Sequence, residues 1–465
     1  MLRKYLTIKH IVVLALFLIA LYLVIVPPET LTEDQTRTLG IVLVTLSLWA
    51  TGIVPGFMAS LLFFAVTLIL KLAPPNVVLS GFTSTAIWLV FSGSIIAATV
   101  RGSGLGERLG VILGRHLTGH YAVLISGLFI ATASLSFIIP SSLGRFFVML
   151  PIAMALASRA GFAKGSNGHT AIALTLILSA NMTGFTILPS NVPNLVLAGA
   201  SETIHGITLT YASYLALHFP VLGLLKGVIT VFLILHFFPD RAGAPLPEHD
   251  EKAPASGPLS ARQWYAIAIL LATLALWMTD SMHGINAAWV GLAASLLLMV
   301  PGIGAIKPED FDRTVSLSVL IFTAGILSLG AVINATGLGT AIAHGLENAL
   351  PLTPGRDFLN FMSLALMAFL TGMFTTLPGV PAVLAPLAAE LSHLTGFSVT
   401  AVLMTQVVGF STVMLPYQAA PLMVGLQVTG QPVSRMIRIT LPLSLITIVA
   451  LLPLDFLWWK LIGVL

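Results

Sequence analysis

The chain has 465 residues, of which 57% are hydrophobic and only 8% are charged. Soluble domains carry about 25% charged residues, so a water-soluble globular protein is excluded and lipid is the expected solvent. The formal net charge is +4, but the basic residues are scattered singly between apolar runs, so we expect no nucleic-acid partner. The absence of cysteine excludes disulfide bonds and thiolate metal sites.

The N-terminal segment, residues 1–37, combines the basic head MLRKYLTIKH with the apolar run IVVLALFLIALYLVIV. No small-residue cleavage site follows this run, and many further apolar runs lie downstream. We therefore expect a first transmembrane helix here rather than a cleaved signal peptide.

Eleven apolar runs are long enough to cross a bilayer, for which a helix needs about 20 residues. They lie at 10–27, 38–54, 56–73, 83–101, 171–200, 212–238, 263–279, 285–301, 315–334, 398–428 and 440–459. Two further stretches, 121–158 and 357–390, are too long for one helix, and each is interrupted in its middle.

The distribution of basic residues predicts the orientation, provided that both interrupted stretches enter and leave on one side. Of the 21 Lys and Arg residues, 15 then share the side of the N-terminus, 4 lie opposite, and Arg145 and Lys226 lie within apolar runs. Basic loops accumulate in the cytoplasm. We therefore expect a multi-pass protein of the bacterial inner membrane with a cytoplasmic N-terminus.

Short motifs recur in the same order on both sides of a polar segment, 239–262, which is the expected cytoplasmic linker. In the halves 38–238 and 263–465, SGLG matches TGLG, VMLPIAMALA matches VLAPLAAELS, and GFTILPSNVP matches GFSTVMLPYQAAP. Five spans per half would invert one copy relative to the other, and inverted repeats with interrupted helices are typical of transporters. We predict an all-α polytopic membrane protein with about 11 transmembrane helices, two re-entrant hairpins and two inverted-topology repeats.

Four breaks combine proline with polar residues: IPSSLGR (139–145), ILPSNVPN (187–194), TTLPGVP (375–381) and LPYQAAP (415–421). Proline removes a backbone donor, and a broken helix survives in a membrane only inside protein or beside a wet cavity. Freed amides favour an anion and freed carbonyls a small cation. The alternative is that these prolines only kink helices. The breaks also supply uncharged polar side chains: Ser141, Ser142, Ser190, Asn191, Asn194, Thr375, Thr376 and Gln418.

Arg145 is a permanent cation inside an apolar run, at a cost of about 2.5–3.5 kcal/mol on insertion scales. No Asp or Glu occurs between residues 108 and 201. An anionic substrate is therefore one expected partner, held through two parallel hydrogen bonds. The alternative is that Arg145 caps carbonyls of the hairpin or reaches the cytoplasmic edge.

Other ionisable residues point to structural roles. Lys226 lies in the middle of a span and is expected to pair with Asp280 or Glu202 or to extend to the interface. His116, His120 and His344 follow the two GLG motifs and are expected at the surface. The motif GSGLGERLG (102–110) is expected to turn the chain into a helix lying flat on the membrane. No hydrolase, metalloprotease or nucleotide-binding motif is found in the sequence.

This layout resembles the divalent anion/sodium symporter family, carriers of dicarboxylates, citrate and sulfate, over about residues 38–460. Family hairpins carry Ser-Asn-Thr nine residues before a Leu-Pro. The matching positions here are Ser141, Ser142 and Leu143 in one hairpin and Thr376, Leu377 and Pro378 in the other. The family's Thr-Pro-Pro-Asn corresponds to Asn-Val-Pro-Asn (191–194) and Ala-Ala-Pro-Leu (419–422).

The departures from the family motif concern charge. The hairpin Asn residues that contact a substrate carboxylate in the family are missing, and Arg145, where the family has Thr, is expected to compensate. The resemblance implies sodium sites, an elevator motion and a homodimer, with no other cofactor. Because the second site is poor in side-chain oxygens, proton coupling or exchange stays open. The implied sodium-site residues are Ser141, Ser142, Gly184, Asn191, Thr376 and Gly379.

We predict a secondary active transporter, not an enzyme, that moves a small divalent anion such as a di- or tricarboxylate or sulfate with Na⁺ or H⁺. The alternative is an arsenite extruder or a Na⁺/H⁺ antiporter, although no break contains the carboxylate that an antiporter needs. A channel is a further alternative, and saturable counterflow driven by a gradient would exclude it. The expected substrate-binding residues are Ser141, Ser142, Arg145, Ser190, Asn191, Asn194, Thr375, Thr376 and Gln418.

Overall fold

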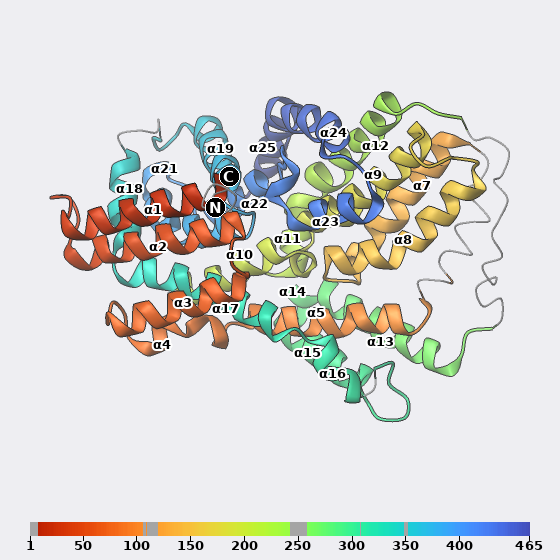
Figure 1. Cartoon of the computed structure of the whole chain (residues 1–465), viewed down its shortest axis with the longest axis horizontal. Helices are drawn as coiled ribbons and strands as arrows, with labels where there is room; N and C mark the ends of the chain where they lie inside the picture. Colours follow the sequence, from red (N-terminus) through yellow and green to blue (C-terminus); the bar gives the residue numbers. More distant parts are fainter. Residues whose placement is uncertain (1–7, 106–107, 109–119, 242–257, 307, 348–351) are drawn as a thin grey trace, which may run out of the picture.

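The computed structural model describes residues 8–105, 108, 120–241, 258–306, 308–347 and 352–465 (Figure 1). Within these residues all regular secondary structure is helical. Seven of the described helices are long and apolar enough to cross a membrane, or eight if one bent pair counts as a span. The chain is therefore an all-helical, multi-span membrane protein, as its composition predicts.

The helices follow the apolar runs closely. The first half contains α1 (Ile8–Ile25), α2 (Glu33–Thr51), α3 (Gly56–Ile69), α4 (Pro75–Val78), α5 (Thr85–Gly102), α7 (Tyr121–Ser134), α8 (Ser142–Arg159), α9 (Asn167–Met182), α10 (Val192–His205), α11 (Tyr211–His218) and α12 (Lys226–Phe237). The second half contains α13 (Ala261–Met278), α14 (Asp280–His283), α15 (Ala287–Leu298), α16 (Phe311–Thr314), α17 (Leu317–Ala335), α18 (Leu338–Glu347), α19 (Asp357–Phe374), α20 (Gly379–Leu384), α21 (Ala388–Thr395), α22 (Val399–Phe410), α23 (Ala420–Thr429), α24 (Val433–Ile446) and α25 (Leu452–Leu461).

The predicted count of eleven spans stays a prediction. Each predicted run contains a helix, but several of these helices, such as α3 and α15, have only 10–17 residues. Two predicted runs are each divided by a break, which separates α9 from α10 and α22 from α23. Helix α22 also follows the segment 379–395 with a bend of 116°. Length alone therefore does not identify each crossing.

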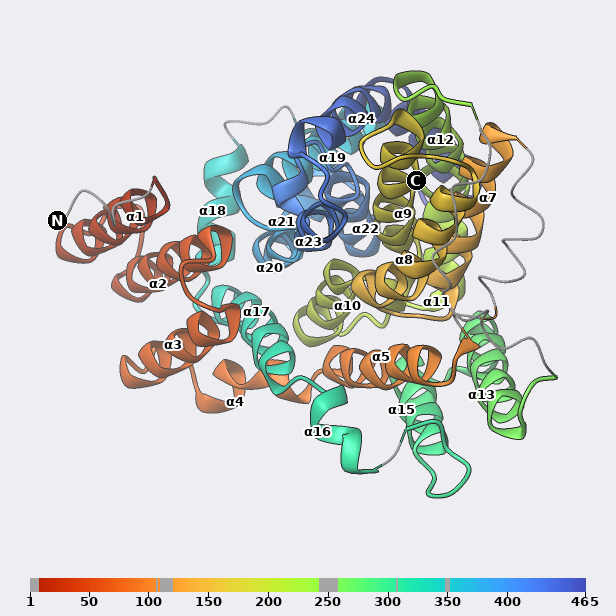
Figure 2. The same cartoon turned by 45° about the vertical axis from the view of Figure 1, so that its right-hand side comes forward.

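The helices form two groups, and both halves of the chain contribute to each group (Figure 2). In one group α1 packs against α2, α2 against α3 and α3 against α17, while α5 packs against α15 and α15 against α13. The other group contains α7 to α12 and α19 to α25. Helix α10 packs against both α17 and α5, so it joins the two groups.

Two capping glutamines make reciprocal contacts between the halves. Helices α2 and α13 each begin with a capping box, Thr32 with Gln35 and Ser260 with Gln263. The Gln35 amide also donates to the carbonyl of Gly337 in the TGLG motif, at 3.2 Å. The Gln263 amide donates to the carbonyl of Ser103 in the SGLG motif, at 2.8 Å. Each glutamine thus contacts the GLG motif on the other side of the 239–262 linker.

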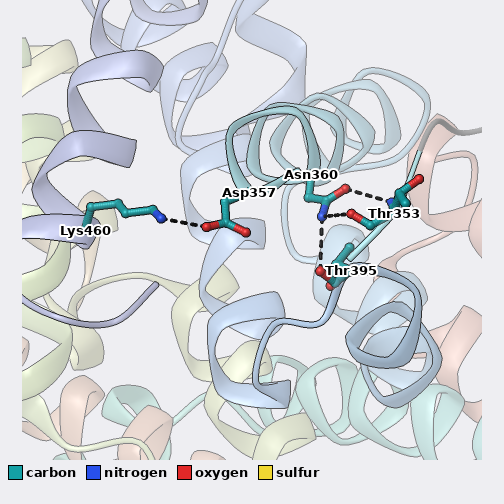
Figure 3. Close-up of polar contacts among 5 residues, drawn as sticks. All are labelled: Thr353, Asp357, Asn360, Thr395 and Lys460. Carbon is teal, nitrogen blue, oxygen red and sulfur yellow. Dashed lines mark hydrogen bonds and ion pairs between the residues drawn. The ribbon is translucent and has the colours of Figure 1, made fainter. Parts of the chain in front are cut away.

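The second interrupted stretch returns to where it began. The buried Asn360 amide donates to the carbonyls of Thr353, before α19, and Thr395, at the end of α21, at 2.8 and 3.1 Å (Figure 3). The Asn360 carbonyl also accepts from the Thr353 amide at 3.1 Å. One side chain therefore closes the base of this hairpin. Beside it Asp357 pairs with Lys460 of α25 at 2.6 Å.

The first interrupted stretch also has its two ends together. Tyr121 begins α7 and Phe162 follows α8, and their rings meet edge to face with centroids 5.7 Å apart. The chain between these two helices leaves the α-helix at Leu135 and re-enters it at Ser142. Both stretches are therefore helix–break–helix hairpins.

Four prolines of the predicted breaks lie at helix beginnings rather than in the middle of helices. Pro189, Pro193, Pro416 and Pro421 occupy first or second positions of helical turns, where a missing amide costs little. The broken segments are shorter than predicted, because 142–145 already forms the first turn of α8 and 379–381 the first turn of α20. Other prolines, such as Pro151 in α8, are accommodated within a helix.

Close packing of α19 against α22 yields a stability prediction. A Cβ atom on Gly409 would lie 2.3 Å from the Ala368 Cβ and 2.6 Å from the Ala365 carbonyl oxygen. We expect Gly409→Ala to destabilise the protein by about 1–3 kcal/mol and to lower its melting temperature in detergent. The control is Gly102→Ala, because a Cβ there meets no atom within 4 Å. Equal melting temperatures for the two variants would contradict this packing.

Candidate functional site

The first broken span is held open by asparagine side chains. Two 3₁₀ turns, Thr183–Thr186 and Leu188–Ser190, separate α9 from α10. The Asn194 amide donates to the carbonyls of Gly184 and Ile187 at 2.8 and 2.9 Å. The Asn191 amide donates to the Asn181 carbonyl at 3.1 Å. These bonds satisfy carbonyls that a regular helix would have paired, as burial requires.

Arg145 connects the first hairpin with the first broken span. Its side chain is fully buried in the first turn of α8, and Ser141 caps that helix by accepting from the Gly144 amide at 3.1 Å. Every nitrogen of the guanidinium donates to a neutral protein oxygen at 2.5–3.2 Å. The acceptors are the carbonyls of Ile139, Ala180 and Ser190, the hydroxyls of Ser142 and Ser190, and the side-chain oxygen of Asn191.

The charge of Arg145 is therefore solvated but not neutralised. No carboxylate of the described residues forms an ion pair with it, and one of its acceptors is a hairpin carbonyl, that of Ile139, as one of the two predicted alternatives requires. A buried cation whose partners are all neutral keeps its full field. At an effective dielectric constant of about 20, such a charge attracts an anion about 6 Å away by roughly 3 kcal/mol.

Gly184 leaves the space that the guanidinium fills. A Cβ atom at this position would lie 2.5 Å from Nη2 of Arg145 and 2.7 Å from Oδ1 of Asn191. The Ser142 hydroxyl donates to the same Asn191 oxygen at 2.5 Å. Four of the predicted residues, Ser142, Arg145, Asn191 and Gly184, are thus in direct contact.

The second hairpin meets the second broken span through backbone and amide groups. The Leu377 amide donates to the Gln418 carbonyl at 3.2 Å. The Gln418 side-chain oxygen accepts from the amides of Met414 and Leu415 at 2.9 and 2.8 Å. Its side-chain nitrogen is buried and has no partner among the described residues. Thr375 bonds back to the Thr371 carbonyl at 2.9 Å, and no cation lies at this break corresponding to Arg145.

The two halves meet at these breaks. Helix α10, which follows the first broken span, packs against α20 of the second hairpin, and α8 of the first hairpin packs against α23. Phe185 and Phe410, at the ends of the two interrupted spans, lie with ring centroids 5.9 Å apart. The four predicted breaks therefore belong to one region of the protein.

Lys226 does not have either of the partners predicted for it. Asp280 instead caps α11 by accepting from the amides of Tyr211 and Ala212, and Glu202 accepts from Thr85. The Lys226 ammonium is buried and donates to the carbonyl of Ser411 at 2.7 Å, where α22 ends.

The carboxylate that interacts electrostatically with Lys226 is Asp455 of α25. Sequence reasoning missed Asp455, although it is the single acidic residue of the apolar run 440–459.

The predicted surface histidines are only partly described. His120 is exposed just before α7, as predicted. His116, the side chain of His344 and residues 106, 107, 109 and 110 of the GSGLGERLG segment lie outside the described residues.

Comparisons with known proteins assign the family. Residues 6–465 match the model of the sodium:sulfate symporter transmembrane region. A membrane protein of Cupriavidus necator is 26% identical over 95% of this chain and 90% of its own length. An L-tartrate/succinate antiporter of Escherichia coli is 25% identical over 58% of each chain.

A solved structure shares the fold. The crystal structure of the YdaH transporter of Alcanivorax borkumensis superposes with a TM-score of 0.57 over 93% of this chain and 99% of its own length, at 17% identity. The family match covers nearly the whole chain and includes both hairpins and both broken spans. The chain belongs to the sodium:sulfate symporter family, and it is an anion transporter of the membrane rather than an enzyme.

Proposed function

We propose that this protein is a secondary transporter of a small dicarboxylate, with Arg145 in place of a bound cation beside the substrate. The main observation behind this proposal is the buried guanidinium of Arg145, which lies between the first hairpin and the first broken span and donates hydrogen bonds to six neutral oxygens. Dicarboxylates are favoured over sulfate because relatives named L-tartrate/succinate antiporter match, although over only 58% of their length. Tricarboxylates and sulfate remain comparison substrates.

The anion would lie between the hairpin tips and the broken spans. Helices α8, α10, α20 and α23 all begin at the four breaks, so their free amides and positive dipole ends gather there. Ser141, Thr375 and Thr376 are only half-buried at this place, so their hydroxyls can reach a solute. Ser142, Ser190, Asn191, Asn194 and Gln418 are buried and would position these groups from behind.

The residues of the first predicted sodium site do not fit an additional cation. Ser142 and Asn191 already accept from Arg145, and Gly184 provides the space occupied by its Nη2 atom. A tethered guanidinium thus takes the role of a sodium ion here, and it does not leave with the substrate. At the second hairpin Thr376 and Gly379 stay candidates for an ion, so coupling would depend on that half.

Several structural features support the finer architecture that we propose. The closed bases of both hairpins suit re-entry on one side of the membrane. The matching contacts that Gln35 and Gln263 make with the two GLG motifs suit two inverted repeats, 38–238 and 263–465, with Gln35 in the N-terminal segment before the first repeat. The two helix groups suit an elevator, with α7 to α12 and α19 to α25 as the moving part. A homodimer and a cytoplasmic N-terminus complete the proposal.

The function is tested by exchange in proteoliposomes. Vesicles loaded with unlabelled succinate or tartrate are expected to take up the labelled anion, saturably and faster than vesicles loaded with chloride. Citrate and sulfate serve as comparison counter-anions. Uptake that is independent of the internal anion and does not saturate would contradict a transporter and indicate a channel.

The role of Arg145 is tested by ion replacement. Wild-type exchange is expected to continue when Na⁺ is replaced by choline, because the guanidinium supplies the charge. Arg145→Ala removes that charge and the hydrogen bonds that it donates to six oxygens, so exchange in choline is expected to fall at least about tenfold, the equivalent of about 1.4 kcal/mol. Because those oxygens suit Na⁺, adding Na⁺ should restore part of the activity.

The matched control is Arg313→Ala, which removes an exposed guanidinium from α16. It should exchange like the wild type, and both variants should reach the membrane in similar amounts. Unchanged exchange by Arg145→Ala in choline would overturn the role of Arg145.

A further inference from the structure

A buried acid and a buried base face each other outside the site described above. Lys226 at the start of α12 and Asp455 in α25 are 3% and 0% exposed. Lys226 uses one of its three donors, to the Ser411 carbonyl, while neither oxygen of Asp455 accepts a hydrogen bond from the described residues. The ammonium of Lys226 is the charge that acts on Asp455, although the two groups form no direct ion pair.

Both residues follow a π-helical segment. Lys226 comes directly after Phe219–Leu225, and Asp455 lies one turn after Thr447–Leu451. Such wide turns are rare and occur frequently at functional sites. The segment Phe219–Leu225 packs against α25, which is the helix that carries Asp455.

The pair is connected to the second broken span. Ser411, whose carbonyl accepts from Lys226, is the residue at which α22 ends. Three residues later the Met414 amide bonds to Gln418 and its carbonyl accepts from Thr440 at 2.7 Å. A change in the charge or position of Lys226 therefore acts on the segment that carries Gln418.

We propose that Lys226 and Asp455 form a proton-binding site that loads one proton together with the transported anion. This inference rests on the function proposed above. An ionised carboxylate without a hydrogen-bond donor is costly in a buried place, and a proton from water on Asp455 removes that cost. Lys226 then keeps its charge uncompensated. The pair changes from neutral to one positive charge, which with Arg145 balances the two charges of a dicarboxylate.

Other titratable groups also lie on the helices packed around the pair, and one of them, His218, can be tested by substitution. His218 of α11 is fully buried, with both ring nitrogens unpartnered among the described residues, and it contacts Trp459 of α25 and Tyr214 at centroid distances of 5.8 and 4.7 Å. His218 is therefore the rival proton acceptor. Of the remaining groups, Asp357 forms an ion pair with Lys460, and Arg438 lies over the rings of Phe237 and Phe238. Three others form hydrogen bonds: Arg435 with Thr170, Asp280 with the Tyr211 amide, and Tyr121 with the Phe238 carbonyl. His236 is exposed, and His169 lies on α9.

The transport test compares succinate accumulation with and without a pH gradient, acid outside, in proteoliposomes. One pH unit supports up to about tenfold greater accumulation for each proton carried along. The wild type is expected to respond to the gradient, and Asp455→Asn and Lys226→Met are expected to lose that response. The matched control Asp357→Asn removes an acid that is paired with the same helix, α25, at the surface and should keep the response. His218→Gln should also keep it.

Exchange at equal pH separates the two proposals. If wild-type vesicles exchange neither succinate nor tartrate at equal pH, the proposed function fails and the proton site fails with it. If they exchange but the gradient changes nothing, or if Asp455→Asn still responds, the proton site alone is overturned. Loss of the response in His218→Gln but not in Asp455→Asn would overturn it as well.

Infrared difference spectroscopy provides a readout that needs no transport. Succinate added to the purified wild-type protein should change the carbonyl band of a protonated carboxyl group. The change should be absent from Asp455→Asn and present in Asp357→Asn. A band that is identical in wild type and Asp455→Asn would overturn the assignment, even if the variant is inactive.

Discussion

The constraint on which this fold depends is the need to satisfy broken backbone inside a membrane. Hydrocarbon offers no hydrogen bonds, so each interruption of a helix must find partners in the protein. Here the partners at the first break are the side chains of Asn191 and Asn194 from the break itself and of Arg145 from the first hairpin. The second break uses Gln418 and Lys226. The side chains that satisfy the broken backbone therefore also bring charge, that of Arg145 and Lys226, into this region.

The two breaks differ in their charge, and this difference separates binding from coupling. At the first break the cation is part of the chain, its acceptors are fully used, and Gly184 leaves no room for another ion. A tethered charge attracts an anion in every state of the transport cycle, so it contributes affinity but no driving force. A driving force needs a group that is loaded on one side of the membrane and unloaded on the other. We propose such a group at the second broken span, where Lys226 of the first half donates to the Ser411 carbonyl.

Much of the architecture could be predicted from the sequence, because hydropathy and proline are local signals. The breaks at Pro140, Pro189 and Pro416 lie where the composition changes, and the structure interrupts its helices there. Partners across the fold could not be predicted. Arg145 finds carbonyls of Ala180 and Ser190, and a carbonyl has no sequence signature. Lys226 donates to the carbonyl of Ser411, 185 positions away, instead of pairing with the predicted Asp280 or Glu202.

Asp455 shows what such local reasoning overlooks. A single carboxylate in an apolar run predicts a position at the end of a transmembrane helix, near the interface, where water can solvate it. In the fold the run 440–459 contains a π-helical segment, which changes the rotation of all later residues relative to a regular helix. Asp455 therefore faces the protein rather than lipid or water. The second π-helical segment, Phe219–Leu225, packs against the helix of Asp455 and leads directly into Lys226. Each of the two buried ionisable residues, Lys226 and Asp455, thus follows a π-helical segment.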